Sequence, residues 1–210
     1  MNAPKQATRI ERFCKTTRWF HWTFALSFLG LAGTGAALTL REAFGIGPEA
    51  ADALAEAHEV LAIVLLTAPW LVGASGDTRR WLVDLAEIAR FDRLDLEWLR
   101  IKATPWRSRD LPPQHKLNAG QKLNALAILA LSVVLTASGV HLWREPAAFV
   151  ALALHLAAFV AWLPAFGVHL FMVFVYPPTR PALRGMLRGS VSREWARQHH
   201  QSWVESEESR

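Results

Sequence analysis

The sequence predicts an all-α integral membrane protein: a four-helix bundle with amphipathic cytoplasmic helices in its 77–117 loop. The first observation is that 52% of the 210 residues are hydrophobic and that many of them gather into four long blocks without Asp, Glu, Lys or Arg. A water-soluble core does not need such blocks. The second observation is that Lys and Arg concentrate beside alternate blocks. We expect a single membrane domain over 1–210.

Four segments are long enough to cross a bilayer, which takes about 20 apolar residues and at least about 17. The second is marginal and contains Pro69, so we expect it to begin inside the preceding EAHE. The fourth is longer than a bilayer requires, and we expect it to tilt, to kink at Pro164 or to project beyond the membrane. The predicted spans are about 19–40, 57–76, 120–143 and 147–176.

The distribution of positive charge predicts the orientation of these spans. The N-terminal segment, the loop between the second and third spans, and the tail carry five, ten and six Lys and Arg, which is 21 of the 23 in the chain. Only Arg41 and Arg144 lie on the other side. The positive-inside rule therefore predicts a multi-pass protein of the bacterial inner membrane, with both termini, the loop 77–119 and the tail 177–210 in the cytoplasm.

Composition also excludes several classes of protein. The net charge of +5 is explained by basic loops beside membrane spans, and we expect no nucleic-acid partner. The single cysteine, Cys14, excludes an internal disulfide framework, covalent c-type haem and zinc or iron–sulfur clusters. The polar N-terminus has no cleavable signal pattern. In the loop, apolar and charged residues alternate near helical period over residues 81–100, which predicts one or two amphipathic helices. We expect these helices to lie on the cytoplasmic face of the membrane or, alternatively, to pack on a partner subunit.

Five of the eight histidines lie in or beside the predicted spans, where ionisable groups are costly and tend to mark cofactor or ion sites. The predicted orientation places His21 and His169 in the cytoplasmic half, and His58 and His155 in the periplasmic half. His155 and His169 are fourteen residues apart, about 40° short of four helical turns, so both project from one face about 21 Å apart. This pattern predicts two stacked sites between facing helices. His141, at the periplasmic end of the third span, is an alternative to His58.

Haem suits these sites better than a bare metal ion. Metal sites in proteins usually recruit carboxylates or cysteines, which the spans lack. Haem needs only axial ligands and a slot of apolar and small residues, and small residues are supplied by GLAGTGAAL (30–38), Gly139 and Gly167. Ligation by two histidines fills both axial positions and favours electron transfer. The alternative for each histidine is a hydrogen-bonded packing role.

Several motifs resemble the membrane cytochrome b (gamma) subunit of respiratory formate dehydrogenases. They are RWFHW (18–22), HKLNAGQKLNAL (115–126), GVHLWREP (139–146), the His155/His169 pair and RGMLRGSVSREWARQHHQSW (184–203). The resemblance implies two haem b groups held by the pairs His58/His155 and His21/His169, which are the pairs that depth predicts, and it argues against ligation by His141. It also implies a periplasmic iron–sulfur (beta) subunit and a molybdenum or tungsten catalytic (alpha) subunit as partners.

By the same resemblance, a quinone (menaquinone or ubiquinone) is reduced beside the cytoplasmic haem at Asn118, Gly120 and Gln121. Amide side chains are donors that a quinone carbonyl needs as it gains electrons. The alternative is that Asn118 and Gln121 form a helix-capping pair. Lys116 and Lys122 are candidates for holding haem propionates or lipid headgroups.

The expected function is therefore that of the quinone-reducing subunit of a formate:quinone oxidoreductase, with formate oxidised on a partner subunit. The cytochrome b of a hydrogenase or of a thiosulfate or polysulfide reductase is an alternative, because it shares the histidine pattern. A haem-free membrane transport or anchor protein is an alternative of a different class.

Overall fold

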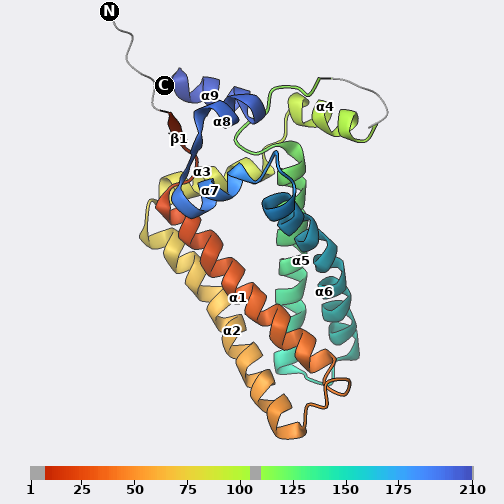
Figure 1. Cartoon of the computed structure of the whole chain (residues 1–210). Helices are drawn as coiled ribbons and strands as arrows, with labels where there is room; N and C mark the ends of the chain where they lie inside the picture. The colour runs from red at the N-terminus through yellow and green to blue at the C-terminus, as the bar shows by residue number, and fades with distance from the viewer. Residues whose placement is uncertain (1–7, 105–109, 210) are drawn as a thin grey trace, which may run out of the picture. The chain divides into compact units, whose positions relative to one another are not determined.

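The computed structural model describes residues 8–104 and 110–209, which are helical apart from a two-stranded sheet (Figure 1). Residues 105–109 of the predicted loop 77–119 lie outside the described residues. In chain order the elements are β1 (Arg9–Glu11), α1 (Lys15–Thr39), α2 (Pro48–Ser75), α3 (Thr78–Ala89), α4 (Arg93–Lys102), α5 (Ala119–Arg144), α6 (Phe149–Leu170), the π-helical turn η1 (Phe171–Val175), α7 (Pro181–Arg188), β2 (Ser190–Ser192), α8 (Arg193–His199) and α9 (Gln201–Glu208).

Four of the described helices are long and apolar enough to cross a membrane: α1, α2, α5, and α6 continued by η1. Their outer faces carry bare apolar side chains, such as Val133 at 68% and Phe149 at 79% exposure. Lipid is the natural cover for so much apolar surface. The predictions of an all-α fold and of an integral membrane protein are confirmed.

The helix that contains the second predicted span is longer than that span. The span is predicted to begin near residue 57, whereas α2 begins at Pro48 and runs for 28 residues, about 42 Å at 1.5 Å per residue. Pro48 occupies the first turn, where a missing N–H costs nothing. The helix also continues through Pro69, and α6 continues through Pro164. Neither proline ends its helix.

The chain forms two compact units. The N-hairpin unit, residues 14–81, contains the α1–α2 hairpin. The C-hairpin unit, residues 8–13 and 82–209, contains the α5–α6 hairpin, α4 and the tail. Within each unit the two long helices pack against each other along their length. The predicted single domain over 1–210 and the bundling of all four spans stay predictions.

Aromatic side chains close the N-hairpin unit at the end opposite its α1–α2 connection. Trp81 lies in contact with Phe20 of α1 and Trp70 of α2, with ring centroids 5.3 and 6.3 Å apart. Its indole reaches the backbone of α2 because residue 73 is glycine: a Cβ there would lie 2.5 Å from the Trp81 ring. The backbone N–H of Asp77 also donates to the Thr16 hydroxyl, at 2.7 Å. These contacts fix the first turn of α3 to both helices.

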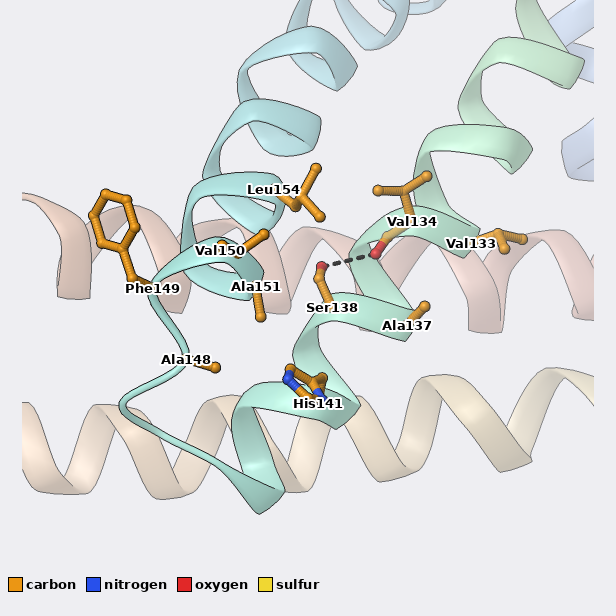
Figure 2. A pocket seen from close by; sticks show the side chains of 10 residues that line it. All are labelled: Val133, Val134, Ala137, Ser138, His141, Ala148, Phe149, Val150, Ala151 and Leu154. Carbon is orange, nitrogen blue, oxygen red and sulfur yellow. Dashed lines mark hydrogen bonds between the residues drawn. The ribbon is translucent and has the colours of Figure 1, made fainter.

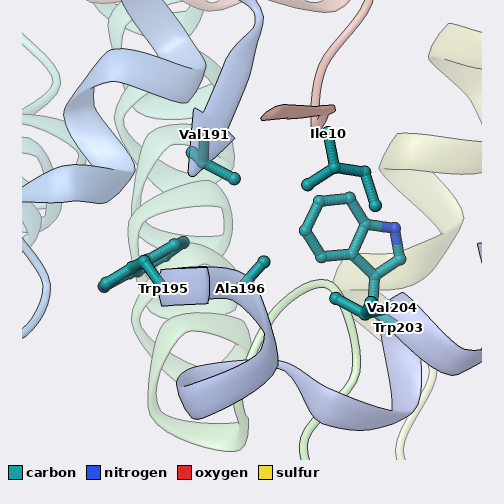
Figure 3. Close-up of a cluster of buried hydrophobic side chains, with 6 residues drawn as sticks. All are labelled: Ile10, Val191, Trp195, Ala196, Trp203 and Val204. Carbon is teal, nitrogen blue, oxygen red and sulfur yellow. The ribbon is translucent and has the colours of Figure 1, made fainter. Parts of the chain in front are cut away.

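The C-hairpin unit brings the two ends of the chain together. Strand β1 pairs antiparallel with β2, with Arg9 opposite Ser192. A small apolar core seals this pair against α8 and α9 (Figure 3), and it consists of Ile10, Val191, Trp195, Ala196, Trp203 and Val204. The N-terminal and C-terminal segments therefore lie on the same side of the membrane, as an even number of spans requires.

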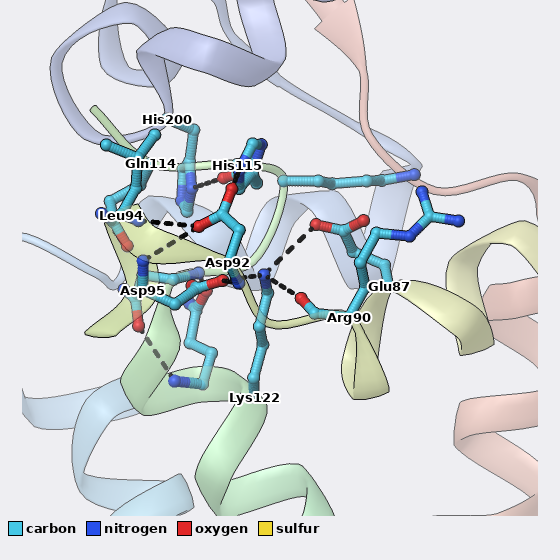
Figure 4. A network of polar contacts seen from close by, with 12 residues as sticks. Glu87, Arg90, Asp92, Leu94, Asp95, Gln114, His115, Lys122 and His200 are labelled. Atoms are coloured by element: carbon cyan, nitrogen blue, oxygen red, sulfur yellow. Dashed lines mark hydrogen bonds and ion pairs between the residues drawn. The ribbon is translucent and has the colours of Figure 1, made fainter. Parts of the chain in front are cut away.

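The predicted amphipathic helices of the loop are confirmed as α3 and α4, and in the C-hairpin unit charges join them to α5. Lys122, fully buried on α5, donates to Asp95 and to the Arg90 carbonyl, both at 2.8 Å, and lies 3.7 Å from Glu87 (Figure 4). Lys116 pairs with Asp84 of α3. An ammonium group without access to water needs such partners to remain charged.

Candidate functional site

The predicted ligand His58 lies on α2 and faces a hydroxyl and a glycine of α1. Its Nδ1 is 2.8 Å from Oγ1 of Thr34. A Cβ on the next residue, Gly35, would lie 3.2 Å from Cε1 of the ring. Glycine at this position therefore lets the imidazole approach the α1 backbone closely.

The C-hairpin unit repeats this arrangement around His155. The residue lies on α6, and its Nδ1 is 3.0 Å from Oγ of Ser138 on α5. A Cβ on Gly139 would lie 3.3 Å from Cε1 of the His155 ring. A histidine on the second helix of each hairpin thus meets a hydroxyl–glycine pair on the first helix, and we call each set a His–hydroxyl–glycine cluster.

The hydrogen bonds of the hydroxyls indicate which ring nitrogen carries the proton. Thr34 donates its single hydroxyl proton to the Gly30 carbonyl at 2.9 Å, and Ser138 donates to Val134 at 2.7 Å (Figure 2). A hydroxyl that donates to its own helix has only acceptor capacity left for the imidazole. We infer that Nδ1–H of each histidine donates to the hydroxyl, which leaves the Nε2 lone pair for a metal; the His155 ring also bonds to the Leu135 backbone.

His21 and His169 are also placed within the spans, near the ends opposite the hairpin connections. On α6, Trp162 lies midway between His155 and His169, and its ring stacks on Phe166 at 4.5 Å. The pairs His21/His169 and His58/His155 each join a residue of the N-hairpin unit to one of the C-hairpin unit. Both pairings stay predictions.

The residues present fit haem better than a bare metal ion. Across residues 8–104 and 110–209, no three His, Cys, Asp or Glu side chains gather closely enough to enclose a metal. A bis-His haem is bound by one imidazole on each of its two faces. The inferred tautomer of His58 and His155 leaves Nε2 available for the bond to iron. Gly35 and Gly139 let both imidazole rings lie close to the neighbouring helix.

His141 has surroundings of its own. It lies on the wall of an apolar groove of about 670 Å³ between α5 and α6 (Figure 2). Ser138 lines the same groove and His155 does not. The remaining lining residues are Val133, Val134, Ala137, Ala148, Phe149, Val150, Ala151 and Leu154. His141 therefore lies on an open apolar groove of the C-hairpin unit.

The predicted quinone residues begin α5, and two of them form the capping pair given above as the alternative. Oδ1 of Asn118 accepts the Gln121 N–H at 2.9 Å, and Oε1 of Gln121 accepts the Asn118 N–H at 3.1 Å. Gly120 has a packing role, since a Cβ there would lie 2.8 Å from the Trp98 ring of α4. The cap uses only the amide oxygens, so the NH₂ groups of both half-buried side chains remain donors.

The two lysines considered for propionates or lipid headgroups have other partners. Lys122 is enclosed by Asp95, Glu87 and the Arg90 carbonyl, and Lys116 binds Asp84. The buried position of Lys122 excludes it from reaching a headgroup. Lys122 is part of the motif HKLNAGQKLNAL, and its role there is to join α4 to α5.

The histidine-rich tail motif also has a structural role. His200 is buried, its Nδ1–H donates to the His115 carbonyl at 2.6 Å, and its Nε2 accepts from Arg12 at 3.2 Å. The Arg12 guanidinium lies over the rings of Phe13 and Trp195 and donates to the Lys116 carbonyl at 2.6 Å. Burial, with the adjacent Arg12 charge, holds the pKa of His200 well below its usual 6.5. Burial also lowers the pKa of Arg12 to about 10.

Thr34 and Ser138 were not expected as site residues. Serine and threonine are common in membrane helices, where they bond to their own backbone, so a single hydroxyl carries little information. The signal that identifies these two is the hydroxyl–glycine dipeptide, Thr34–Gly35 in GLAGTGAAL and Ser138–Gly139 in TASGVHL. It occurs once in the first helix of each hairpin.

Comparison with known proteins places this site in a family. The family model described as prokaryotic cytochrome b561 matches residues 12–189. The nitrate-inducible formate dehydrogenase cytochrome b556(Fdn) subunit of Escherichia coli K12 is 31% identical over 122 residues, which cover 53% of this chain and 55% of that protein. The formate dehydrogenase cytochrome b556 subunit of Haemophilus influenzae is 25% identical over 216 residues, 95% of this chain and 84% of that protein.

The E. coli match spans about half of the relative's length, whereas the family match runs from Arg12 to Gly189. It includes all four membrane helices and both His–hydroxyl–glycine clusters. A haem-free transporter or anchor, the alternative of a different class, does not agree with this match. The protein is a membrane cytochrome b and belongs to the prokaryotic cytochrome b561 family.

Proposed function

We propose that this chain is the di-haem b membrane subunit of a formate dehydrogenase complex. It takes electrons from a periplasmic iron–sulfur subunit, conducts them through two bis-His haems, and delivers them to quinone at the cytoplasmic face. The names of the relatives support the assignment to formate dehydrogenase. The observation that carries the electron-transfer role is the Nδ1–H bond of His58 and His155 to a backbone-anchored hydroxyl, which presents Nε2 to iron.

Each bound haem would supply a reversible one-electron couple between ferric and ferrous iron. The protein's own contribution is to hold the imidazoles in one tautomer and one orientation. His58 and His155 hold the haem nearer the donor, and His21 and His169 hold the haem nearer the quinone. The apolar span surfaces keep water from both positions.

Haem stoichiometry tests this function directly. A pyridine haemochrome assay on the purified protein should give two b haems per chain, with low-spin bis-His spectra. His58→Ala and His155→Ala should each remove one haem, and the same one. His21→Ala and His169→Ala should each remove the other. His141→Ala is the matched control and should retain both. A wild-type count of one or zero would rule out the proposal.

We assign quinone reduction to the start of α5. The capping pair holds Asn118 and Gln121 by their amide oxygens. The NH₂ groups then serve as fixed donors to a quinone carbonyl, whose negative charge grows as electrons arrive. The quinone gains two electrons and takes up two protons from the adjacent aqueous phase, becoming the quinol.

Substitutions that keep the cap separate this role from a structural one. Asn118→Ser and Asn118→Asp retain a good N-cap acceptor but lack the amide donor. Quinone reduction should fall at least about tenfold, the loss expected when a donor to developing charge is removed. Thermal stability and haem spectra should stay as in the wild type. If these variants reduce quinone at the normal rate, Asn118 is a capping residue alone.

The proposed partners are tested by co-purification. An affinity tag on this chain should recover an iron–sulfur subunit and a molybdenum or tungsten subunit, and the complex should reduce quinone with formate as donor. Recovery of a nickel–iron hydrogenase, or of a thiosulfate or polysulfide reductase, would replace formate dehydrogenase in the proposal and leave the electron path unchanged.

A further inference from the structure

The two His–hydroxyl–glycine clusters have the same construction in separate parts of the chain. In both, the hydroxyl residue immediately precedes the glycine on the first helix, and the histidine lies on the second helix. The Nδ1–O distances are 2.8 and 3.0 Å, and a Cβ added to the glycine would lie 3.2 or 3.3 Å from Cε1 of the ring. One cluster uses threonine and the other serine, and both side chains carry a hydroxyl. The feature common to the two clusters is therefore the hydrogen bond between the hydroxyl and the histidine.

The bond to the backbone gives each hydroxyl a fixed direction. Oγ1 of Thr34 lies 2.9 Å from the Gly30 carbonyl oxygen and 3.2 Å from that of Leu31. Oγ of Ser138 lies 2.7 Å from the Val134 carbonyl oxygen and 3.2 Å from that of Leu135. With the proton held toward these carbonyls, the oxygen lone pair points at Nδ1–H. An acceptor on the outer nitrogen fixes a ligand's ring and raises its basicity.

We propose that Thr34 and Ser138 are positioning residues of one haem, acting through His58 and His155. This inference rests on the proposed function, in which these two histidines hold the same haem. Each hydroxyl stabilises the Nδ1–H tautomer and increases electron donation from Nε2 to iron. Greater donation favours the ferric state, so the pair lowers the reduction potential of this haem relative to the other.

The same two helices contain serines that serve as matched controls. Ser27 on α1 is buried and donates to the Thr23 carbonyl at 2.8 Å. Ser132 on α5 is buried and donates to the Ile128 carbonyl at 2.7 Å. Each makes the backbone bond of its counterpart, and no histidine shares it. Removing either one tests the general effect of losing a buried hydroxyl from these helices.

The experiment uses the complex purified with its haems. Thr34→Val and Ser138→Ala remove the acceptor and keep most of the side-chain volume. Redox titration followed by optical and EPR spectroscopy should show the potential of one haem shifted to a more positive value, with the other haem unchanged. The shifted haem should be the same in both variants and shift further in the double variant. Its transfer to an apo-globin acceptor should be about 10- to 100-fold easier, the usual effect of losing such a partner.

Conservative exchanges complete the test. Thr34→Ser and Ser138→Thr keep the hydroxyl and should restore the wild-type potential, while Ser27→Ala and Ser132→Ala should leave both potentials in place. If Thr34→Val and Ser138→Ala match these controls in a protein that holds two haems, the hydroxyls are packing groups and the inference is wrong. Shifts in different haems would refute a shared haem. A wild type without two haems would instead refute the proposed function.

Discussion

Each hairpin unit contains a His–hydroxyl–glycine cluster, and the two units differ in how they are closed. Each presents a histidine to a hydroxyl and a glycine, with distances that agree within 0.2 Å. At the opposite end, Trp81 closes the N-hairpin unit by packing into the space left by Gly73. The C-hairpin unit is closed by the buried pair Lys122–Asp95 and by the Arg12–His200 contact.

The two units have the same histidine cluster but different contacts at the opposite end, and the reason is that the cluster has stricter requirements than the closing contacts. A ligand imidazole has strict requirements for tautomer and orientation, and both hairpins hold the proposed ligand with the same kind of bond. Closing a hairpin requires only complementary surfaces. Aromatic packing is insensitive to pH, whereas buried charges depend on every partner remaining present and correctly protonated. The C-hairpin unit should therefore be the more sensitive of the two to substitution and to acid.

The largest effect is expected at Lys122. Lys122→Met leaves Asp95, whose side chain is 1% exposed, as a buried charge without its cation. Breaking a buried pair in this way costs about 3–5 kcal/mol. The free energy of unfolding in detergent would measure the loss.

The double variant Lys122→Met/Asp95→Asn is the control for that experiment. It removes both charges and keeps a side-chain oxygen for the α4 cap. It should be more stable than Lys122→Met alone, since an apolar replacement of a whole pair is often close to neutral. If the single and double variants are equally unstable, the charge pairing is not what joins α4 to α5.

A smaller effect is expected from Gly73→Ala in the N-hairpin unit. The added methyl would meet the rigid Trp81 indole at 2.5 Å and displace it from between Phe20 and Trp70. Such overpacking costs about 1–3 kcal/mol. Gly30→Ala is the matched control, because its methyl meets the Leu61 side chain at 2.9 Å, and that chain is flexible. Equal stability of the two variants would show that Trp81 does not depend on the space at Gly73.

The smallest effect is a dependence on pH that belongs to the C-hairpin unit. The pKa of His200 is depressed by burial and by Arg12, so the unfolded chain binds a proton more readily than the folded one. Its stabilising contribution is complete above the ordinary pKa of 6.5 and is lost as pH falls below it, by at most about 1.4 kcal/mol per pH unit. Protection factors for hydrogen exchange of residues 190–204, which correct for the pH dependence of chemical exchange, should fall between pH 7 and about pH 5.

Two comparisons test whether His200 causes that dependence on pH. His200→Gln should make the protection factors of the tail nearly independent of pH, whereas His199→Gln should preserve the dependence. Protection factors around Trp81 in the N-hairpin unit should change little over the same range. An equal fall in both units would mean that His200 is not the group responsible.

Much of the fold was predictable because membrane spans follow from few physical requirements. Long uncharged blocks identify helices that lipid can surround, and the four observed helices fall on them. The helix α2 begins at Pro48, ahead of the predicted span 57–76, and includes Glu49, Asp52 and Glu56; the bounds of the span stay a prediction. A helix can project beyond the bilayer, and charges on its exposed first turns are compatible with solvent.

The histidines of the candidate site can be selected from the sequence for a similar reason, and their role as haem ligands stays a prediction. Histidines in an apolar span stand out against their surroundings, and helical spacing gives their depth and face. The hydroxyls of Thr34 and Ser138 do not stand out, and their importance depends on which residue lies across the helix interface. The roles of Lys122 and His200 were also hidden, because Asp95 and Arg12 are 27 and 188 residues away from them.

The pairing of β1 with β2 has a consequence for biosynthesis. Arg9 finds its partner Ser192 only after nearly the whole chain has been translated, which takes on the order of ten seconds or more at about 5–20 residues per second. Until then Arg12 has neither His200 nor Trp195 to enclose it. A chain that stalls before its last span is inserted leaves this end open. The small sheet therefore forms only after both hairpins and α7 have been translated.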